Sequence, residues 1–287
     1  MRAAEEMPAT MKNAIRKRIF ATAILFAVIA VGPVHAQDEK DSGDAALAKK
    51  LSNPIGSLIS VPIQYNYDGG YGPSDGNKGF INVQPVIPFQ LSDNLTLVVR
   101  TIIPFAWQEN IAGDSGSQFG LGDVVQSGFF VPRTRATALG SMTWGIGPAI
   151  NWPTSTDRLL GSGTWGLGPT GVVFFRNGHW GYGALISQLW GIAKTRSDAP
   201  DLSNMLVQPF ISYTTATAWS FAVSSESSFN WTANDTAIAL NLGVSKLMAV
   251  GKQRVQFQLG LRYWAKEPDN GPSGVGFRFG VTFLFPT

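Results

Sequence analysis

The sequence predicts an all-β fold, a transmembrane antiparallel up-and-down β-barrel of about 12 strands preceded by a cleaved signal peptide. Three observations lead to it: an export signal at the N-terminus, strands that alternate between apolar and polar residues, and connections that alternate between long and short. The clearest strand is 276–285, where five large apolar residues fall on alternate positions. Strand side chains point to opposite faces with period two, so one face is wholly apolar. About ten such residues cross a tilted barrel wall, which makes this the closing strand.

The first 36 residues have the order of features found in a secretory signal peptide. Basic residues between positions 12 and 18 precede the apolar run 19–31, and Ala36 offers a small residue at the cleavage site. The run is too short for a transmembrane helix. We therefore expect residues 1–36 to be removed, and an uncleaved membrane anchor is the alternative.

Charge and composition argue against a nucleic-acid-binding protein and favour a membrane barrel. The chain has 22 Lys+Arg and 19 Asp+Glu, and residues 1–36 hold five of the basic and two of the acidic residues, so the mature chain has 17 of each. This balance gives no reason to expect nucleic acid as a partner. The chain lacks Cys, which excludes disulfides. It has 32 Gly, 9 Trp and 18 Phe and is 14% charged, below the roughly 25% of soluble domains, as fits a membrane barrel.

Twelve strands follow from the alternation of apolar and polar residues. They are expected at residues 58–67, 80–89, 95–105, 119–131 with a bulge near Asp123, 141–152, 165–175, 180–192, 206–213, 219–231, 236–246, 253–264 and 275–285. Connections after odd strands are mostly long and those after even strands short, except 232–235. Long extracellular loops that alternate with short periplasmic turns indicate an outer-membrane barrel. Several prolines fall inside these strands, and we expect them at strand ends or bulges because Pro removes a ladder donor.

The prediction divides the chain into three parts: a signal peptide at 1–36, a periplasmic N-terminal segment at 37–57, and the outer-membrane barrel at 58–287. Within the second part, residues 44–51 can form a short helix that ends before Pro54. Such a helix would plug the lumen or lie at the periplasmic rim. The other interpretation is a loose leader into the first strand.

Five ionisable residues lie on the polar faces of their strands and are expected to face the lumen: Arg100, Glu226, Arg254, Arg262 and Arg278. On the lipid face, an Arg near the midplane would cost roughly 2–4 kcal/mol. Their role is either to line a solute pathway or to brace the barrel. Arg262 and Arg278 should lie almost opposite each other in the last hairpin, which predicts an under-compensated positive patch. The alternative is that Glu267 or Asp269 folds back from the loop to neutralise them.

No catalytic group, metal or cofactor is expected. Residues 161–166 match G-x-G-x-x-G but lack the preceding strand and following helix of a dinucleotide site. Ser115 lacks a positioned base, because His179 falls in a turn predicted on the opposite side of the membrane. There is no Cys and no His pair for zinc. Asp68 and Asp75 lack the spacing of a calcium loop.

Six blocks of the sequence resemble a known family. They are LSNPIGSLISVPIQYNYDG (51–69), QPVIPF (84–89), QFGLGDV (118–124), WPTSTDRLLGSGTWGLGPT (152–170), QPFISYTTATAW (208–219) and YWAKEPDNGPSGVGFRF (263–279). These blocks are similar to a transporter family of bacterial outer-membrane proteins, related to the phenol-degradation meta-pathway barrel proteins and often mislabelled "neuromedin U". The resemblance covers nearly the whole mature chain. It implies a transporter for hydrophobic or aromatic compounds and brings no established binding residues. The chain departs from the barrel pattern at its end, where Pro286 and Thr287 follow the last aromatic residue.

The function expected is a narrow, porin-like passive pore or transporter for small solutes, aromatic or hydrophobic ones among them, in the outer membrane of a Gram-negative bacterium. Eight strands leave an interior filled by side chains and sixteen or more leave a wide channel, so about twelve should leave a narrow one. The alternative is a non-conducting structural or ligand-binding barrel, and an enzyme is not expected. The expected partners are outer-membrane lipid, the barrel-assembly machinery during biogenesis, and small-molecule solutes.

Overall fold

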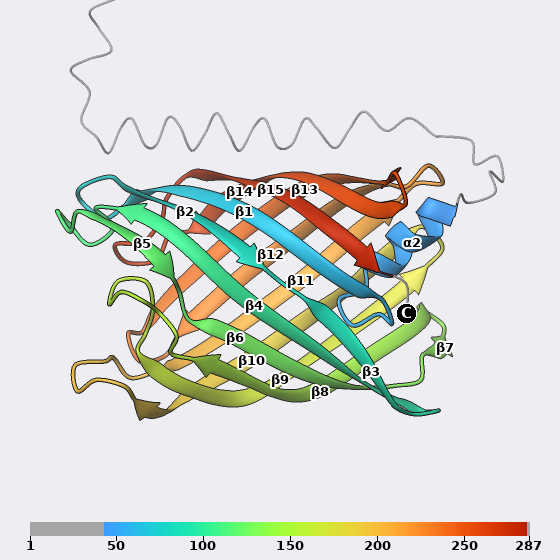
Figure 1. The fold of residues 1–287 in the computed structure, drawn as a ribbon, viewed down its shortest axis with the longest axis horizontal. Helices are drawn as coiled ribbons and strands as arrows, with labels where there is room; N and C mark the ends of the chain where they lie inside the picture. Colours follow the sequence, from blue (N-terminus) through green and yellow to red (C-terminus); the bar gives the residue numbers. More distant parts are fainter. Residues whose placement is uncertain (1–42, 286–287) are drawn as a thin grey trace, which may run out of the picture. The chain divides into compact units, whose positions relative to one another are not determined.

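The computed structural model of the chain describes residues 43–285, which form one short helix and fifteen strand segments (Figure 1). The predicted signal peptide lies outside the described residues. The elements are α2 (Gly43–Leu51), β1 (Ile59–Tyr71), β2 (Gly76–Val83), β3 (Val86–Ser92), β4 (Leu95–Glu109), β5 (Ser117–Leu121), β6 (Val124–Pro132), β7 (Arg135–Thr137), β8 (Gly140–Trp152), β9 (Thr164–Asn177), β10 (Trp180–Lys194), β11 (Ser203–Thr214), β12 (Trp219–Asn230), β13 (Asp235–Val250), β14 (Gln253–Lys266) and β15 (Val275–Phe285).

The strands form one closed antiparallel barrel. β3 continues the line of β2, and β5, β6 and β7 share another line, so the fifteen segments make twelve strands around the barrel. The barrel closes where β15 pairs with β1, from Ile59↔Phe285 to Tyr67↔Phe277. The predicted strand number, direction and closing strand are confirmed. Closure also leaves no unpaired edge along the wall.

The two ends of the barrel carry different connections. At the end where β1 begins and β15 ends, which we call the turn end, connections have two to four residues. At the opposite end, the loop end, they have four to eleven residues. The connections 72–75 and 231–234 are the shortest at this end, with four residues each; the sequence predicted a short connection at the second place and a long one at the first.

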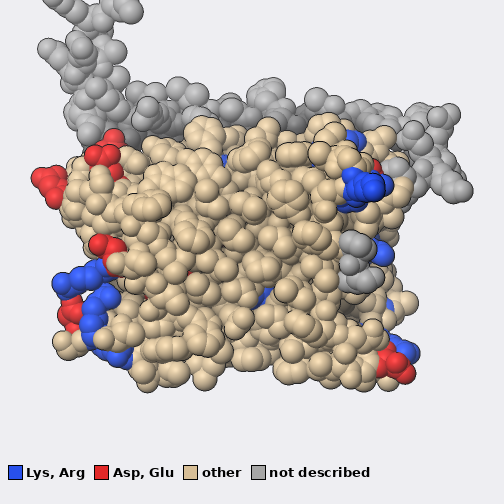
Figure 2. Space-filling model, viewed as in Figure 1, with Lys and Arg blue, Asp and Glu red and all other residues tan. Residues whose placement is uncertain are grey.

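The outer wall is apolar. Large side chains in its middle are exposed, among them Ile146 (59%), Leu259 (61%) and Leu242 (55%). Figure 2 shows the charged side chains of one face gathered at the two ends, with a nearly uncharged belt between them. Exposed apolar surface of this extent would be a liability in water, but it suits contact with lipid.

Prolines mark the irregular places in the wall. Pro85 lies between β2 and β3, and the chain leaves the sheet again at Gly122 and Asp123, between β5 and β6, where the sequence predicted a bulge. Pro148, Pro169 and Pro209 lie inside β8, β9 and β11. Each adjoins a stretch where pairing with one neighbouring strand is interrupted. These interruptions follow from the ladder donor that Pro lacks.

Helix α2 forms where the sequence allowed a short helix. Asp44 lies in its first turn and Lys49 and Lys50 in its last, which complements the helix dipole. Pro54 follows soon after its end. No helix among residues 43–285 is long and apolar enough to cross a membrane.

Candidate functional site

The candidate site is the lumen of the barrel, which the polar faces of the strands line. On β1 the inward positions include Gln64, Asn66 and Asp68, and on β14 they include Gln258 and Arg262. The residues between them point outward and form the apolar belt. Period-two alternation is therefore enough to build a polar interior inside an apolar wall.

A charged network crosses the loop-end half of the lumen. Glu226 of β12 accepts hydrogen bonds from Arg262 Nη2 at 2.6 Å and from Arg278 Nη2 at 3.0 Å. Arg278 also donates from Nε to Asn66 Oδ1 at 2.7 Å. The three charged side chains are largely buried, with exposed fractions of 10%, 11% and 21% for Arg262, Arg278 and Glu226. Four strands, β12, β14, β15 and β1, are thus joined by side chains inside the barrel.

Glycines opposite Arg278 give its side chain room to reach Glu226. Arg278 pairs with Gly260 on β14, and Gly260 pairs with Gly243 on β13. Neither residue has a side chain to block the lumen above it. The guanidinium of Arg278 can therefore extend past two strands to a carboxylate on the third.

Asp68 provides the second negative charge of the network. Its carboxylate lies 3.5 Å from Arg262 Nη1 and accepts a hydrogen bond from Trp264 Nε1 at 3.0 Å. The Arg262 guanidinium also lies over the Trp264 ring, 4.7 Å from its centre. Hydrogen bonds, an ion pair and a cation–π contact together fix the position of Arg262.

The predicted positive patch at Arg262 and Arg278 is not what the structure shows. The two residues are not opposite each other, because Arg262 pairs with Gly276 and Arg278 pairs with Gly260. Both guanidiniums have carboxylate partners, which come from Glu226 and Asp68 and not from Glu267 or Asp269. Pairing a buried charge offsets the cost of removing it from water, which is the physical reason for this arrangement.

Arg254 and Arg100, the other predicted lumen residues, make no hydrogen bond or ion pair with Glu226 or Asp68. Arg254 Nε is 2.7 Å from Asp44 Oδ1 of helix α2, at the turn end. Arg100 Nη2 donates to Gln84 Oε1 at 2.7 Å. Among the described residues, no carboxylate lies within ion-pair distance of Arg100.

The N-terminal segment, residues 43–58, lies inside the turn end of the lumen. Ala45 and Ala48 of α2 are buried in a cluster with Leu247 and Leu284 of the wall and with Ala218 of the turn between β11 and β12. Further along the segment, Ile55 is 2% exposed and packs into a second cluster. That cluster contains the wall residues Val98, Phe129, Val131, Val172 and Leu185. Arg176 of β9 adds hydrogen bonds to the Lys49 carbonyl and the Ser52 hydroxyl.

Sequence reasoning missed several of these residues. Asp68 continues the polar alternation of the first strand, which was predicted to end at residue 67 and extends to Tyr71. Arg176 was assigned to a turn, whereas β9 continues to Asn177 and places Arg176 on the inward face with Phe174. In both cases a longer strand would have revealed the residue. Nothing in the local sequence marks Ile55 as a core residue.

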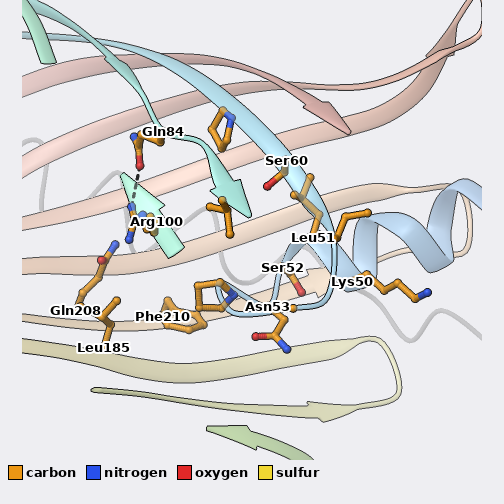
Figure 3. Close-up of a pocket in the computed structure, with 15 residues that line it drawn as sticks. Lys50, Leu51, Ser52, Asn53, Ser60, Gln84, Arg100, Leu185, Gln208 and Phe210 are labelled. Atoms are coloured by element: carbon orange, nitrogen blue, oxygen red, sulfur yellow. Dashed lines mark hydrogen bonds between the residues drawn. The ribbon is translucent and has the colours of Figure 1, made fainter. Parts of the chain in front are cut away.

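Among the cavities lined by residues 43–285, three lie along the lumen. One of about 260 Å³ lies between the N-terminal segment and the wall, and Arg100, Gln84, Gln208 and Phe210 are among its lining residues (Figure 3). A second of about 490 Å³ lies on another side of the segment, beside Arg176. The third, about 350 Å³, lies at the loop end, beside Asp68, Arg262 and Trp264. The lumen therefore has open volume on both sides of the charged network.

Within residues 43–285, no three His, Asp or Glu side chains come together as metal ligands. Asp68, one of the two carboxylates weighed for calcium, is engaged by Arg262 and Trp264. The lumen chemistry is that of charged and amide side chains lining a passage, with apolar side chains at the turn end.

Comparison with known proteins places the fold. No family model matches the chain, and no curated protein matches it. Among solved structures, an outer membrane channel from Pseudomonas putida F1 is similar with a TM-score of 0.63 and 16% identity, over 80% of this chain and 96% of that chain.

Two further solved barrels match less well. The outer membrane phospholipase of Salmonella typhi, solved as a dimer with bound calcium, has a TM-score of 0.46 and 13% identity over 85% of this chain and 99% of its own. A FadL homologue from Pseudomonas aeruginosa has a TM-score of 0.40 and 10% identity over 81% of this chain and 91% of its own. Scores this low carry no argument about function. The similarity to the P. putida protein supports one conclusion: the chain has the fold of a bacterial outer-membrane barrel.

Proposed function

We propose that the chain is an outer-membrane protein of a Gram-negative bacterium that forms a narrow passive pore or transporter for small solutes. The observation that carries the proposal is a closed barrel with an apolar outer belt and a polar, partly open lumen. The N-terminal export signal in the sequence agrees with this location.

The solutes we propose are small, with aromatic or hydrophobic compounds among them. The proposal draws on the family resemblance of the sequence blocks and on the mixed lining of the lumen. Phe210 and Leu185 line the cavity beside Arg100, and Trp264 lines the cavity at the loop end. A lining of this kind accepts a compound with one apolar face and one polar group. The P. putida protein is described as a channel; for the present chain, channel activity rests on the lumen itself.

The N-terminal segment favours a second candidate function, a barrel that binds a ligand without conducting. Residues 43–58 fill much of the turn end and are held there by two buried clusters and by Arg176 and Arg254. If this segment never moves, solutes enter from the loop end and stop at it.

Solute uptake into liposomes separates the two functions. Purified protein would be reconstituted and tested with a panel of aromatic acids, sugars and alkanes, with protein-free liposomes as the control. A pore gives uptake of small members of the panel that increases with the amount of protein. Binding of a panel member without any uptake would support the non-conducting barrel, and neither binding nor uptake would contradict both functions.

A further inference from the structure

We propose that Arg100 and Gln208 form a binding site for the carboxylate of a small organic acid whose apolar body lies against Phe210 and Leu185. This inference rests on the proposed function, because it names the class of solute that the lumen selects. Benzoate and short fatty acids such as hexanoate belong to that class.

The first observation is a surplus of positive charge at Arg100. Three arginines, Arg100, Arg262 and Arg278, interact electrostatically with Glu226. Arg278 and Arg262 occupy the two carboxylate oxygens of Glu226. Asp68 supplies a second negative charge, next to Arg262. Three positive charges therefore face two negative ones. Arg100 is the arginine of the three that has no ion pair among the described residues.

The second observation is that the cavity beside Arg100 lacks a compensating acid. Fifteen residues line it, and they include the cations Arg100 and Lys50 but neither Asp nor Glu. The cavity on the other side of the segment repeats this bias, with Lys50, Arg133 and Arg176 against Asp93. Low-dielectric walls strengthen such a field, so an anion is favoured at this position.

The third observation is the set of free donors. Gln84 Oε1 accepts one N–H of Arg100 and its amide nitrogen donates to Gln64 Oε1 at 3.4 Å, so Gln84 orients the guanidinium and is itself occupied. The remaining N–H groups of Arg100 have no partner among the described residues. The Gln208 amide has none there either, and Figure 3 shows the Arg100 guanidinium between Gln84 and Gln208. A guanidinium and a nearby amide N–H₂ are donors that fit the two oxygens of a carboxylate.

The fourth observation is the apolar surface beside these donors. Phe210 and Leu185 line the same cavity, and the Phe210 ring stacks on Phe174 with centres 6.3 Å apart. The ring is therefore held in place and offers a flat face to a ligand. The cavity volume of about 260 Å³ is below the roughly 300 Å³ at which pockets for drug-sized molecules begin. The fit is to a small acid with one ring or a short chain.

A purely structural role for Arg100 makes a different prediction. Arg100 pairs with Val86 at the start of β3, and its bond to Gln84 spans the break at Pro85. If bracing that break were its whole role, replacing Arg100 would lower the stability of the barrel without changing how it treats charged and neutral ligands. The test therefore compares benzoate with benzamide, which has the same ring and no charge.

The experiment is calorimetric titration of the full mature chain in detergent with sodium benzoate and with benzamide. The variants are Arg100→Gln, Arg100→Lys and Gln208→Leu, and the control is Arg135→Gln, which removes an exposed charge of β7 at the same end of the barrel. We expect benzoate to bind wild type at least tenfold more tightly than benzamide, the effect of one charge-assisted hydrogen bond. Arg100→Gln should abolish that preference, Gln208→Leu should reduce it, and Arg100→Lys should keep most of it. The control should match wild type.

Equal binding of the two compounds by wild type, or a preference that survives Arg100→Gln, would overturn the proposal. Heat-modifiable gel mobility checks that each variant is folded, and Gln208→Leu with Arg100→Lys decides the matter if Arg100→Gln does not fold. Liposome uptake distinguishes a failure of this binding site from a failure of the proposed pore. If benzoate binding depends on Arg100 but liposomes show no uptake, the pore is refuted and the binding site stands. If liposomes show uptake but benzoate binding does not depend on Arg100, the binding site is refuted and the pore stands.

Discussion

The two halves of the lumen treat their charges differently. In the loop-end half, Arg262 and Arg278 converge on Glu226 and Asp68, so each guanidinium has a carboxylate partner. In the turn-end half, Arg100 and Arg176 meet only amide, hydroxyl and carbonyl oxygens. Ion pairs between its own side chains stabilise the first half. The second half is filled by residues 43–58 and contains arginines that have no carboxylate partner among the described residues. This difference suggests that structural support and solute selection lie in separate halves of one barrel.

The largest effect is expected from Glu226→Gln, which removes the carboxylate that Arg262 and Arg278 share. Breaking a buried ion pair typically costs about 3–5 kcal/mol, and water in the lumen should reduce that cost. We expect a clear loss of unfolding free energy in urea denaturation of the protein in lipid vesicles. The variant should also shift reversal potentials toward anions, because two positive charges lose their partner.

The matched control is Glu109→Gln, which removes an exposed carboxylate at the loop end of β4. If the urea midpoint of unfolding shifted as much in Glu109→Gln as in Glu226→Gln, the charged network would not stabilise the barrel as its geometry indicates.

The next effect concerns the segment inside the turn end. Ile55→Ala removes the buried side chain that holds residues 43–58 against the wall, a change that costs about 2–5 kcal/mol in well-packed cores. Because the segment joins the barrel at β1 alone, we expect local release and not global unfolding. Hydrogen exchange of residues 44–56 should become faster while β4 stays protected. The control is Leu139→Ala, at an exposed turn position, which should change neither the exchange of residues 44–56 nor that of β4. Unchanged exchange in Ile55→Ala would show that other contacts hold the segment.

A smaller effect is expected at the rim of the turn end. The Arg254–Asp44 pair is partly exposed, with side-chain exposed fractions of 43% and 29%. Exposed pairs contribute about 0–1 kcal/mol. Arg254→Gln should therefore speed hydrogen exchange in the first turn of α2 by a few-fold, and the difference should shrink in high salt. An effect as large as that of Ile55→Ala would mean that the ion pair, and not apolar burial, anchors the segment.

The smallest effect lies in the loop between β10 and β11. A hydrogen bond and the charge of Lys194, 2.7 Å away, lower the pKa of Asp201. A lowered folded-state pKa contributes stability above the unfolded pKa of about 3.9 and loses it as pH falls through the folded value. Because the group is exposed, Lys194→Gln should leave stability nearly unchanged at pH 7 and raise the Asp201 pKa in a carboxylate NMR titration. An unmoved titration would contradict the pairing.

Much of the fold could be predicted because it depends on local patterns. Alternation with period two sets both faces of each strand, so twelve strands and an inward position for Arg278 follow from the residues themselves. The neutralisation of Arg278 could not be predicted in this way. It needs Glu226, 52 residues away, and two glycines in register on the strands between them. Long-range register of this kind has no signal in a single strand.

The position of the N-terminal segment was left open for a related reason. The spacing of Ala45 and Ala48 allows a helix with one small apolar face, but the residues that bury it come from three places far apart in the chain: the turn before β12, the end of β13 and the end of β15. The Ile55 cluster likewise draws on β4, β6, β9 and β10. A plug, a rim helix and a loose leader differ only in these distant contacts.

The most direct test of the proposed pore is planar-bilayer conductance of wild type beside a variant that lacks residues 43–53. These residues include α2, and they occupy the turn end without belonging to the barrel wall. We expect a small, reproducible conductance for wild type and a larger one for the variant, at matched insertion and with heat-modifiable mobility confirming both barrels. Folded barrels that give no conductance with or without the segment would contradict the claim that this lumen is a path for solutes.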